Sequence, residues 1–157
     1  MRSQLVSVAS AFPGADWDLL VRLPGRVVVA ATSGERASPS RAVAEGIAGL
    51  DAIAAGRASP SKLVQAVVAA IYTERTGLAD DDDETDPRSV LASCARATSV
   101  LDDRAEAADR QAYREWLGGI AERIRSAGPS GDAPVKKADV AGAAFLDDLS
   151  AALRPPR

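Results

Sequence analysis

Apolar side chains recur along most of this chain at intervals of three and four residues, which is the period of an amphipathic α-helix. One stretch, RVVVA at residues 26–30, could instead form a buried strand. No second stretch is available to pair with it, and an isolated strand leaves its backbone hydrogen-bonding groups unsatisfied. The pattern therefore predicts an all-α fold.

The pentapeptide RASPS occurs at residues 36–40 and again at 57–61, each time directly before an apolar run of helical period. The first run is Val43, Ile47, Leu50 and Ala54, and the second is Val64, Val67, Val68 and Ile71. Each run predicts an amphipathic helix that buries its apolar face against the rest of the protein.

The serine and proline of each pentapeptide suit the start of a helix. Serine side chains cap the free N–H groups of a first helical turn, and proline is favoured at the first helical position. We therefore expect Ser38 and Ser59 to be N-caps, with Pro39 and Pro60 as the first helical residues. An arginine two residues before each serine and a proline after it would also suit a phosphorylation site.

Four glycines are expected to have structural roles. Gly56 and Gly77 follow the two apolar runs, and glycine readily adopts the left-handed conformation that ends a helix. Gly118 and Gly119 lie inside a third helical pattern, where each costs about 1 kcal/mol relative to alanine. Such a cost predicts that another helix packs closely at that point.

Four further segments carry helical patterns. Residues 16–35 read as two short helical segments kinked at Pro24. Asp86 and Pro87 are placed to cap and open a helix that ends near Asp102. Its apolar residues are Val90, Leu91, Cys94, Ala97 and Leu101. The longest helix is expected to bury Tyr113, Trp116, Leu117, Ile120, Ala121 and Ile124, and the last to bury Phe145, Leu146, Leu149 and Leu153.

The length of 157 residues favours one domain with a single core. We expect a flexible N-terminus at residues 1–14, a single helical domain at 15–153 and a flexible C-terminus at 154–157. An acidic loop at residues 79–86 is expected to separate two halves of the domain.

Composition excludes several classes of function. The chain has no histidine, so imidazole-based serine and cysteine catalysis and His-ligated zinc sites are excluded. A net charge of -3 gives no reason to expect a basic surface for nucleic acid. The first ten residues contain no apolar run of seven or more and no later stretch approaches eighteen, so we expect neither a secretion signal nor a membrane span. The single cysteine, Cys94, is expected to be a buried, unreactive thiol in a reducing compartment. We therefore expect a cytoplasmic protein that binds neither nucleic acid nor membrane.

The acidic stretch LADDDDETDP invites a comparison with calcium-binding loops. From Asp80, the glycine required at position six is Thr85, and the glutamate required at position twelve is Leu91. We expect this stretch to be a solvated loop and predict no catalytic, cofactor-binding or metal-binding residue in the chain.

Two stretches resemble the tellurite-resistance TerB-like superfamily. Residues 16–35 (DWDLLVRLPGRVVVAATSGE) resemble its opening helix, and residues 112–128 with 143–153 resemble its long penultimate and closing helices. The resemblance spans most of residues 15–153 and implies a bundle of about seven short helices in two halves, with a role in stress responses. It also implies metal binding at a turn that here reads Thr32-Ser33-Gly34-Glu35, where the family's aspartate is missing.

These observations favour a non-enzymatic bacterial protein that acts through an unidentified protein partner. One alternative is a metal- or carboxylate-dependent enzyme whose acids converge from separate helices, with Glu35, Glu45, Glu74, Glu115 and Glu122 as candidates. Another is an adaptor regulated by phosphorylation at Ser38 and Ser59. Converging buried carboxylates would favour the enzyme, whereas an exposed apolar surface would favour the partner protein.

Overall fold

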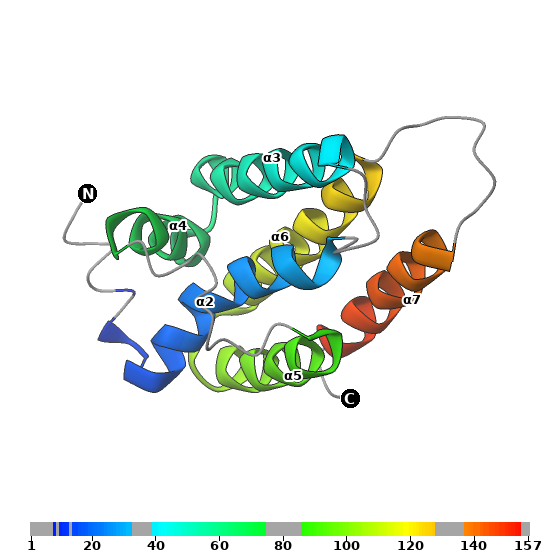
Figure 1. Cartoon of the computed structure of the whole chain (residues 1–157). Helices are drawn as coiled ribbons and strands as arrows, with labels where there is room; N and C mark the ends of the chain where they lie inside the picture. The colour runs from blue at the N-terminus through cyan, green and yellow to red at the C-terminus, as the bar shows by residue number, and fades with distance from the viewer. Residues whose placement is uncertain are drawn as a thin grey trace.

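A computed structural model of the chain describes residues 8, 10–12, 14–32, 39–74, 86–127 and 137–154 (Figure 1). Within these ranges there is no strand, which confirms the predicted all-α class. The described helices are α2 (Gly14–Ala31), α3 (Pro39–Ala55), α4 (Lys62–Glu74), α5 (Pro87–Arg104), α6 (Ala107–Ser126) and α7 (Lys137–Ala152), with one short 3-10 helix, η2 (Gly56–Ala58).

Helix α6 is the centre of the bundle, because it packs against α2, α3, α4, α5 and α7 (Figure 1). Its buried residues are Tyr113, Leu117, Ile120, Ala121 and Ile124, as its apolar period predicts. Trp116 is half-buried and packs against the edge of this core. Because α2 contacts both α5 and α6, residues before and after the expected acidic loop share one core.

Helix α2 continues through Pro24 from Gly14 to Ala31, so the predicted division into two segments is wrong. Proline lacks the N–H that would bond the carbonyl four residues earlier, which in this helix belongs to Leu20. The hydroxyl of Tyr113 on α6 donates a hydrogen bond to that carbonyl over 2.8 Å. The lost backbone partner is thus replaced from a neighbouring helix, and the proline is tolerated inside α2.

Helix α5 begins as predicted. Asp86 has extended backbone angles and accepts a hydrogen bond from the N–H of Ser89 over 3.1 Å, and Pro87 is the first helical residue. The hydrogen bonds from Ser89 lower the pKa of the Asp86 carboxyl. The helix ends at Arg104, two residues beyond the predicted end. It buries Val90, Cys94, Ala97, Thr98 and Leu101.

Helix α7 confirms the pattern at the end of the chain. Phe145, Leu149 and Leu153 are buried against α5 and α6, and Leu146 is partly buried. The hydroxyl of Thr98 on α5 donates to the carbonyl of Cys94 over 3.0 Å, and it lies 3.3 Å from the carbonyl oxygen of Ala152. This contact joins the end of α7 to the middle of α5.

The two pentapeptides start their helices differently. Helix α3 begins at Pro39 as predicted, while Ser38 lies outside the described residues. Helix α4 begins at Lys62, and the Oγ of Ser61 accepts from the N–H of Val64 over 3.3 Å. The predicted cap at Ser59 is therefore wrong by two residues.

A local backbone change explains this shift. The turn η2 directly follows α3, and Ser59 after it is extended (φ -63°, ψ 141°). The Oγ of Ser59 accepts from the N–H of Ser61 over 3.1 Å, and the Oγ of Ser61 donates to Asp109 on α6 over 2.8 Å. Ser61 thus both caps α4 and fixes its start to α6.

The glycines that permit close packing are not the ones predicted. A Cβ atom added at Gly118 or Gly119 would meet nothing within 4 Å, so the expected close helix contact there is wrong. A Cβ at Gly56 would lie 2.7 Å from Cγ2 of Val68. Gly56 is therefore required by close packing and not by a left-handed turn, and Gly77 lies outside the described residues.

The packed part of the chain includes a residue that precedes the expected boundary at residue 15. Phe12 is buried and stacks on Trp17 with 6.1 Å between ring centroids. The guanidinium of Arg104 donates to the carbonyl of Ala11 over 3.3 Å. Residues 11 and 12 are therefore held by both α2 and α5.

Candidate functional site

Three large apolar side chains on α3 face solvent. Val43, Ile47 and Leu50 are 61%, 55% and 49% exposed. The prediction that this run forms the buried face of its helix is therefore wrong. The residues that α3 buries lie on the opposite side, and they are Glu45, Gly49, Ala52 and Ile53.

Close contacts explain why this face of α3 is turned inward. A Cβ added at Gly49 would lie 2.9 Å from Cγ1 of Val28 on α2 and 3.3 Å from Cδ1 of Ile124 on α6. The indole N–H of Trp116 donates to the carbonyl of Ala52 over 3.1 Å. The missing side chain of glycine lets the backbone of α3 approach its neighbours, and close approach increases the dispersion contacts per residue.

The inward face also carries a charge. Glu45 is 1% exposed, and its Oε1 lies 3.1 Å from Nε of Arg41, one helical turn earlier. A buried carboxylate is stable when it is paired and hydrogen-bonded, so this ion pair belongs to the packing of α3.

The exposed side of α3 continues into η2. Ala55 has right-handed helical angles (φ -59°, ψ -22°), so the backbone turns in the same sense from α3 into Gly56–Ala58. Arg57 follows Leu50 by seven residues, a spacing that keeps both on one side of a helix. The guanidinium carbon of Arg57 lies 4.3 Å from the ring centroid of Tyr72, which is 45% exposed. We call Val43, Ile47, Leu50, Arg57 and Tyr72 the outer α3 surface.

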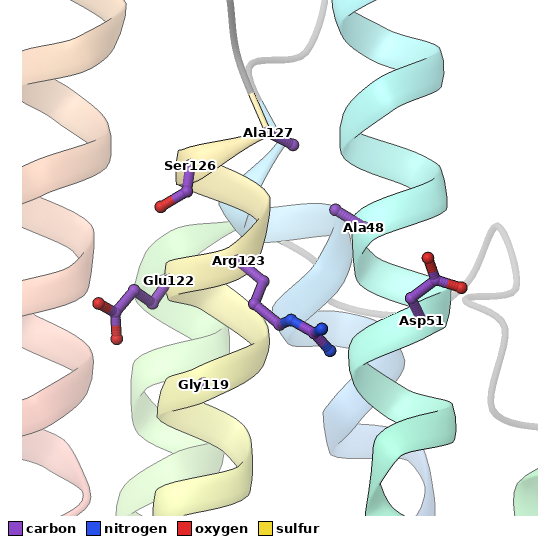
Figure 2. A pocket seen from close by; sticks show the side chains of 7 residues that line it. All are labelled: Ala48, Asp51, Gly119, Glu122, Arg123, Ser126 and Ala127. Atoms are coloured by element: carbon purple, nitrogen blue, oxygen red, sulfur yellow. The ribbon is translucent and has the colours of Figure 1, made fainter. Parts of the chain in front are cut away.

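A shallow groove of about 480 Å³ lies beside this surface, between α3 and α6 (Figure 2). Its lining includes Asp51 from α3 and Glu122 and Arg123 from α6. Figure 2 shows Arg123 reaching toward α3, whereas Glu122 points away from it. All three side chains are exposed, so the groove is a solvated edge of the surface and not an enclosed ligand site.

The carboxylates that were candidates for catalysis lie in different environments. Glu45 faces the core, while Glu115 and Glu122 are exposed on α6. Glu115 accepts a hydrogen bond from Gln111 over 2.8 Å. Glu35 and the side chain of Glu74 lie outside the described part of the structure. Within that part, no three acidic or cysteine side chains are grouped as metal ligands.

Cys94 is buried, as predicted. Burial raises the pKa of its thiol to about 12. The neighbouring phenol of Tyr113 also has a pKa well above its ordinary value, chiefly because burial disfavours its charged form. Both groups therefore stay protonated near neutral pH, and Tyr113 acts as a hydrogen-bond donor to Leu20.

The outer α3 surface was missed from the sequence, but a signal for it was present. Glu45, Gly49, Ala52 and Gly56 follow one another at helical intervals on the side of α3 opposite Val43, Ile47 and Leu50. Two glycines in one stripe indicate a face that packs closely. The acidic run at residues 80–83 lies outside the described residues.

The fold and its exposed surface define the protein as an all-α helical bundle with an apolar helix face open to solvent. Searches against models of protein families, curated proteins and solved structures found no match. No helix in the described ranges is long and apolar enough to cross a membrane.

Proposed function

We propose that the protein is a non-enzymatic interaction module that binds a protein partner through the outer α3 surface. The observation that carries the proposal is the exposure of Val43, Ile47 and Leu50 on one side of a single helix. Scattered apolar residues are common on protein surfaces, but a contiguous apolar stripe on one helix is typical of an interaction site. Covering this stripe would contribute about 25 cal/mol per Å² of apolar area removed from water.

Contacts on the inward side of α3 explain why the apolar stripe faces solvent. Gly49, the Arg41–Glu45 ion pair and the bond from Trp116 to Ala52 all favour the same orientation of the helix. The apolar stripe is therefore available to a partner without any rearrangement of the core. A role in a stress response, which the TerB-like resemblance implies, remains a prediction.

Site-specific photo-crosslinking in the native host tests the proposal. A photoreactive phenylalanine analogue at Val43 is expected to give a discrete crosslinked species, and the same analogue at Ala92, an exposed residue on α5, is expected to give none. When Ile47→Gln is added to the protein with the analogue at position 43, the crosslinked species should no longer form. Equal crosslinking from both positions, or crosslinking that is insensitive to Ile47→Gln, would contradict the proposal.

A further inference from the structure

We propose that the partner presents an amphipathic helix that lies along α3 and places a carboxylate on Arg57. This inference rests on the proposed function and specifies the chemistry of the partner. It is carried by two observations at opposite ends of one surface. One is an apolar stripe of helical spacing, and the other is an arginine that lies over an aromatic ring and has no ion pair with any described residue.

The spacing of the stripe matches a helix. The exposed Val43, Ile47 and Leu50 and the half-buried Ala54 are separated by four, three and four residues, which is the alternation of a helix-pairing seam. From Val43 to Ala54 the stripe is about 16 Å long, or three turns at 1.5 Å per residue. A Cβ added at Gly46, beside Ile47, would meet nothing within 4 Å, so the surface next to the stripe is open. An incoming helix can therefore place its own residues between these side chains.

Arg57 supplies the charge that selects the partner. Its guanidinium lies on the ring of Tyr72, and within the described ranges it makes no hydrogen bond or ion pair. A guanidinium whose carbon lies over an aromatic ring still has N–H groups that can donate to a partner. A carboxylate is the group that these donors bind in a bidentate manner. Because the stacking fixes the position of the charge, less side-chain entropy is lost on binding.

The two ends of the surface also set the direction of the partner. Arg57 lies beyond the C-terminal end of α3, and acidic residues are favoured in the first turn of a helix. A partner with Glu in its first turn would run antiparallel to α3, with its N-terminus beside Arg57. Its helix dipole would then oppose that of α3, which is the favourable arrangement for two adjacent helices.

Fluorescence anisotropy with designed peptides tests the inference on the full chain. The probe is a labelled helical peptide of about 18 residues with leucines at intervals of four, three and four and two glutamates in its first turn. A second peptide with lysines in place of the glutamates is the matched probe. Arg57→Gln and Ile47→Gln are the test variants, and Arg96→Gln, an exposed arginine on α5, is the matched control. Circular dichroism confirms that each variant remains folded.

The glutamate peptide is expected to bind wild type and Arg96→Gln with equal affinity. The lysine peptide should bind these two proteins about fivefold more weakly than the glutamate peptide does. Arg57→Gln should weaken binding of the glutamate peptide about fivefold, so that the two peptides bind this variant with equal affinity. Raising the salt concentration should reduce the same difference. Ile47→Gln should weaken both peptides by about tenfold, because both use the apolar stripe.

The outcomes separate this inference from the proposed function. Peptide binding that depends on Ile47 but not on Arg57 or peptide charge would overturn the acidic-helix inference and leave the outer α3 surface as the binding site. If neither peptide binds, the inference that the partner is a helix is overturned. The proposed function is tested separately by crosslinking from position 43. Self-association of wild type that is lost in Ile47→Gln would assign the surface to a second copy and also overturn the inference.

Discussion

Helices α6 and α3 pack against each other, yet they use their large side chains in opposite ways (Figure 1). Helix α6 buries Leu117, Ile120 and Ile124 and exposes charged residues. Helix α3 exposes Val43, Ile47 and Leu50 and turns glycine, alanine and a paired glutamate inward along with Ile53. A helical period therefore identifies a helix, but it does not decide which face is buried when the opposite face can pack more closely.

The difference follows from the positions of the two helices. Helix α6 is surrounded by five other helices, so its large residues reach partners in several directions. Helix α3 packs chiefly on α6, and Figure 1 shows it at one edge of the bundle. A helix with one main neighbour needs only a narrow buried face, and small residues allow that face to approach closely.

The largest expected effect concerns the contact that joins these two helices. Trp116→Ala should destabilise the protein by about 3–5 kcal/mol, because it removes an aromatic ring packed against Gly56 and the donor to Ala52. Trp116→Phe keeps most of the ring and should cost about 1–2 kcal/mol. Urea denaturation measures both variants. A loss below about 1 kcal/mol for Trp116→Ala would show that α3 is not held to α6 at this point.

The next effect tests whether α6 compensates for the proline in α2. Tyr113→Phe should cost about 1–3 kcal/mol, because the carbonyl of Leu20 then has no donor. In a Pro24→Ala background the backbone N–H at position 24 can bond that carbonyl, so the same substitution should cost less than about 1 kcal/mol. A double-mutant cycle from denaturation curves measures this coupling. If Tyr113→Phe lowers the free energy of unfolding equally with proline and with alanine at position 24, Tyr113 does not compensate for the proline.

Two glycines on α3, one at the close contact and one in open space, test how closely this helix approaches its neighbours. Gly49→Ala should destabilise by about 1–2 kcal/mol, because its Cβ would lie 2.9 Å from Val28. Gly46→Ala lies one turn away in open space and should stabilise by about 0.5–1 kcal/mol through helix propensity alone. Thermal unfolding of the two variants is the measurement. If both substitutions stabilise the protein, the backbone of α3 does not approach its neighbours this closely.

A smaller effect concerns the start of α4, where Ser61 contacts Asp109 on α6. Ser61→Ala should cost about 1 kcal/mol, because the helix loses its cap. Ser59→Ala should cost only a few tenths of a kcal/mol, since its Oγ accepts a single loop N–H. The reverse order in urea denaturation would place the cap at Ser59, as the sequence alone predicts.

The sequence predicted features that depend on neighbouring residues. The cap at Asp86 and the buried stripe of α6 each involve residues within one helix, and both are confirmed. The missed features depend on distant contacts. Pro24 is tolerated because of Tyr113, 93 residues away from Leu20, and Gly49 faces Val28 and Ile124 on two other helices. The cap at Ser61 depends on the turn η2, which no residue pattern before it indicated.

The candidate surface was missed for the same reason. The alternation of Val43, Ile47 and Leu50 is identical to that of a buried stripe, and only the contacts of the opposite face decide its direction. Arg57 and Tyr72 come from different elements, so their stacking has no signal in the spacing of either segment.

Denaturation of two isoleucine variants of α3 tests the central claim most directly, namely that its large apolar stripe faces outward. Ile47→Gln, at an exposed position, should change the free energy of unfolding by less than about 0.5 kcal/mol. Ile53→Gln, at a position that is 3% exposed, should destabilise by about 2–5 kcal/mol, because it buries an amide in place of an apolar side chain. A loss of several kcal/mol for Ile47→Gln with little effect of Ile53→Gln would mean that the stripe is part of the core and would contradict the account.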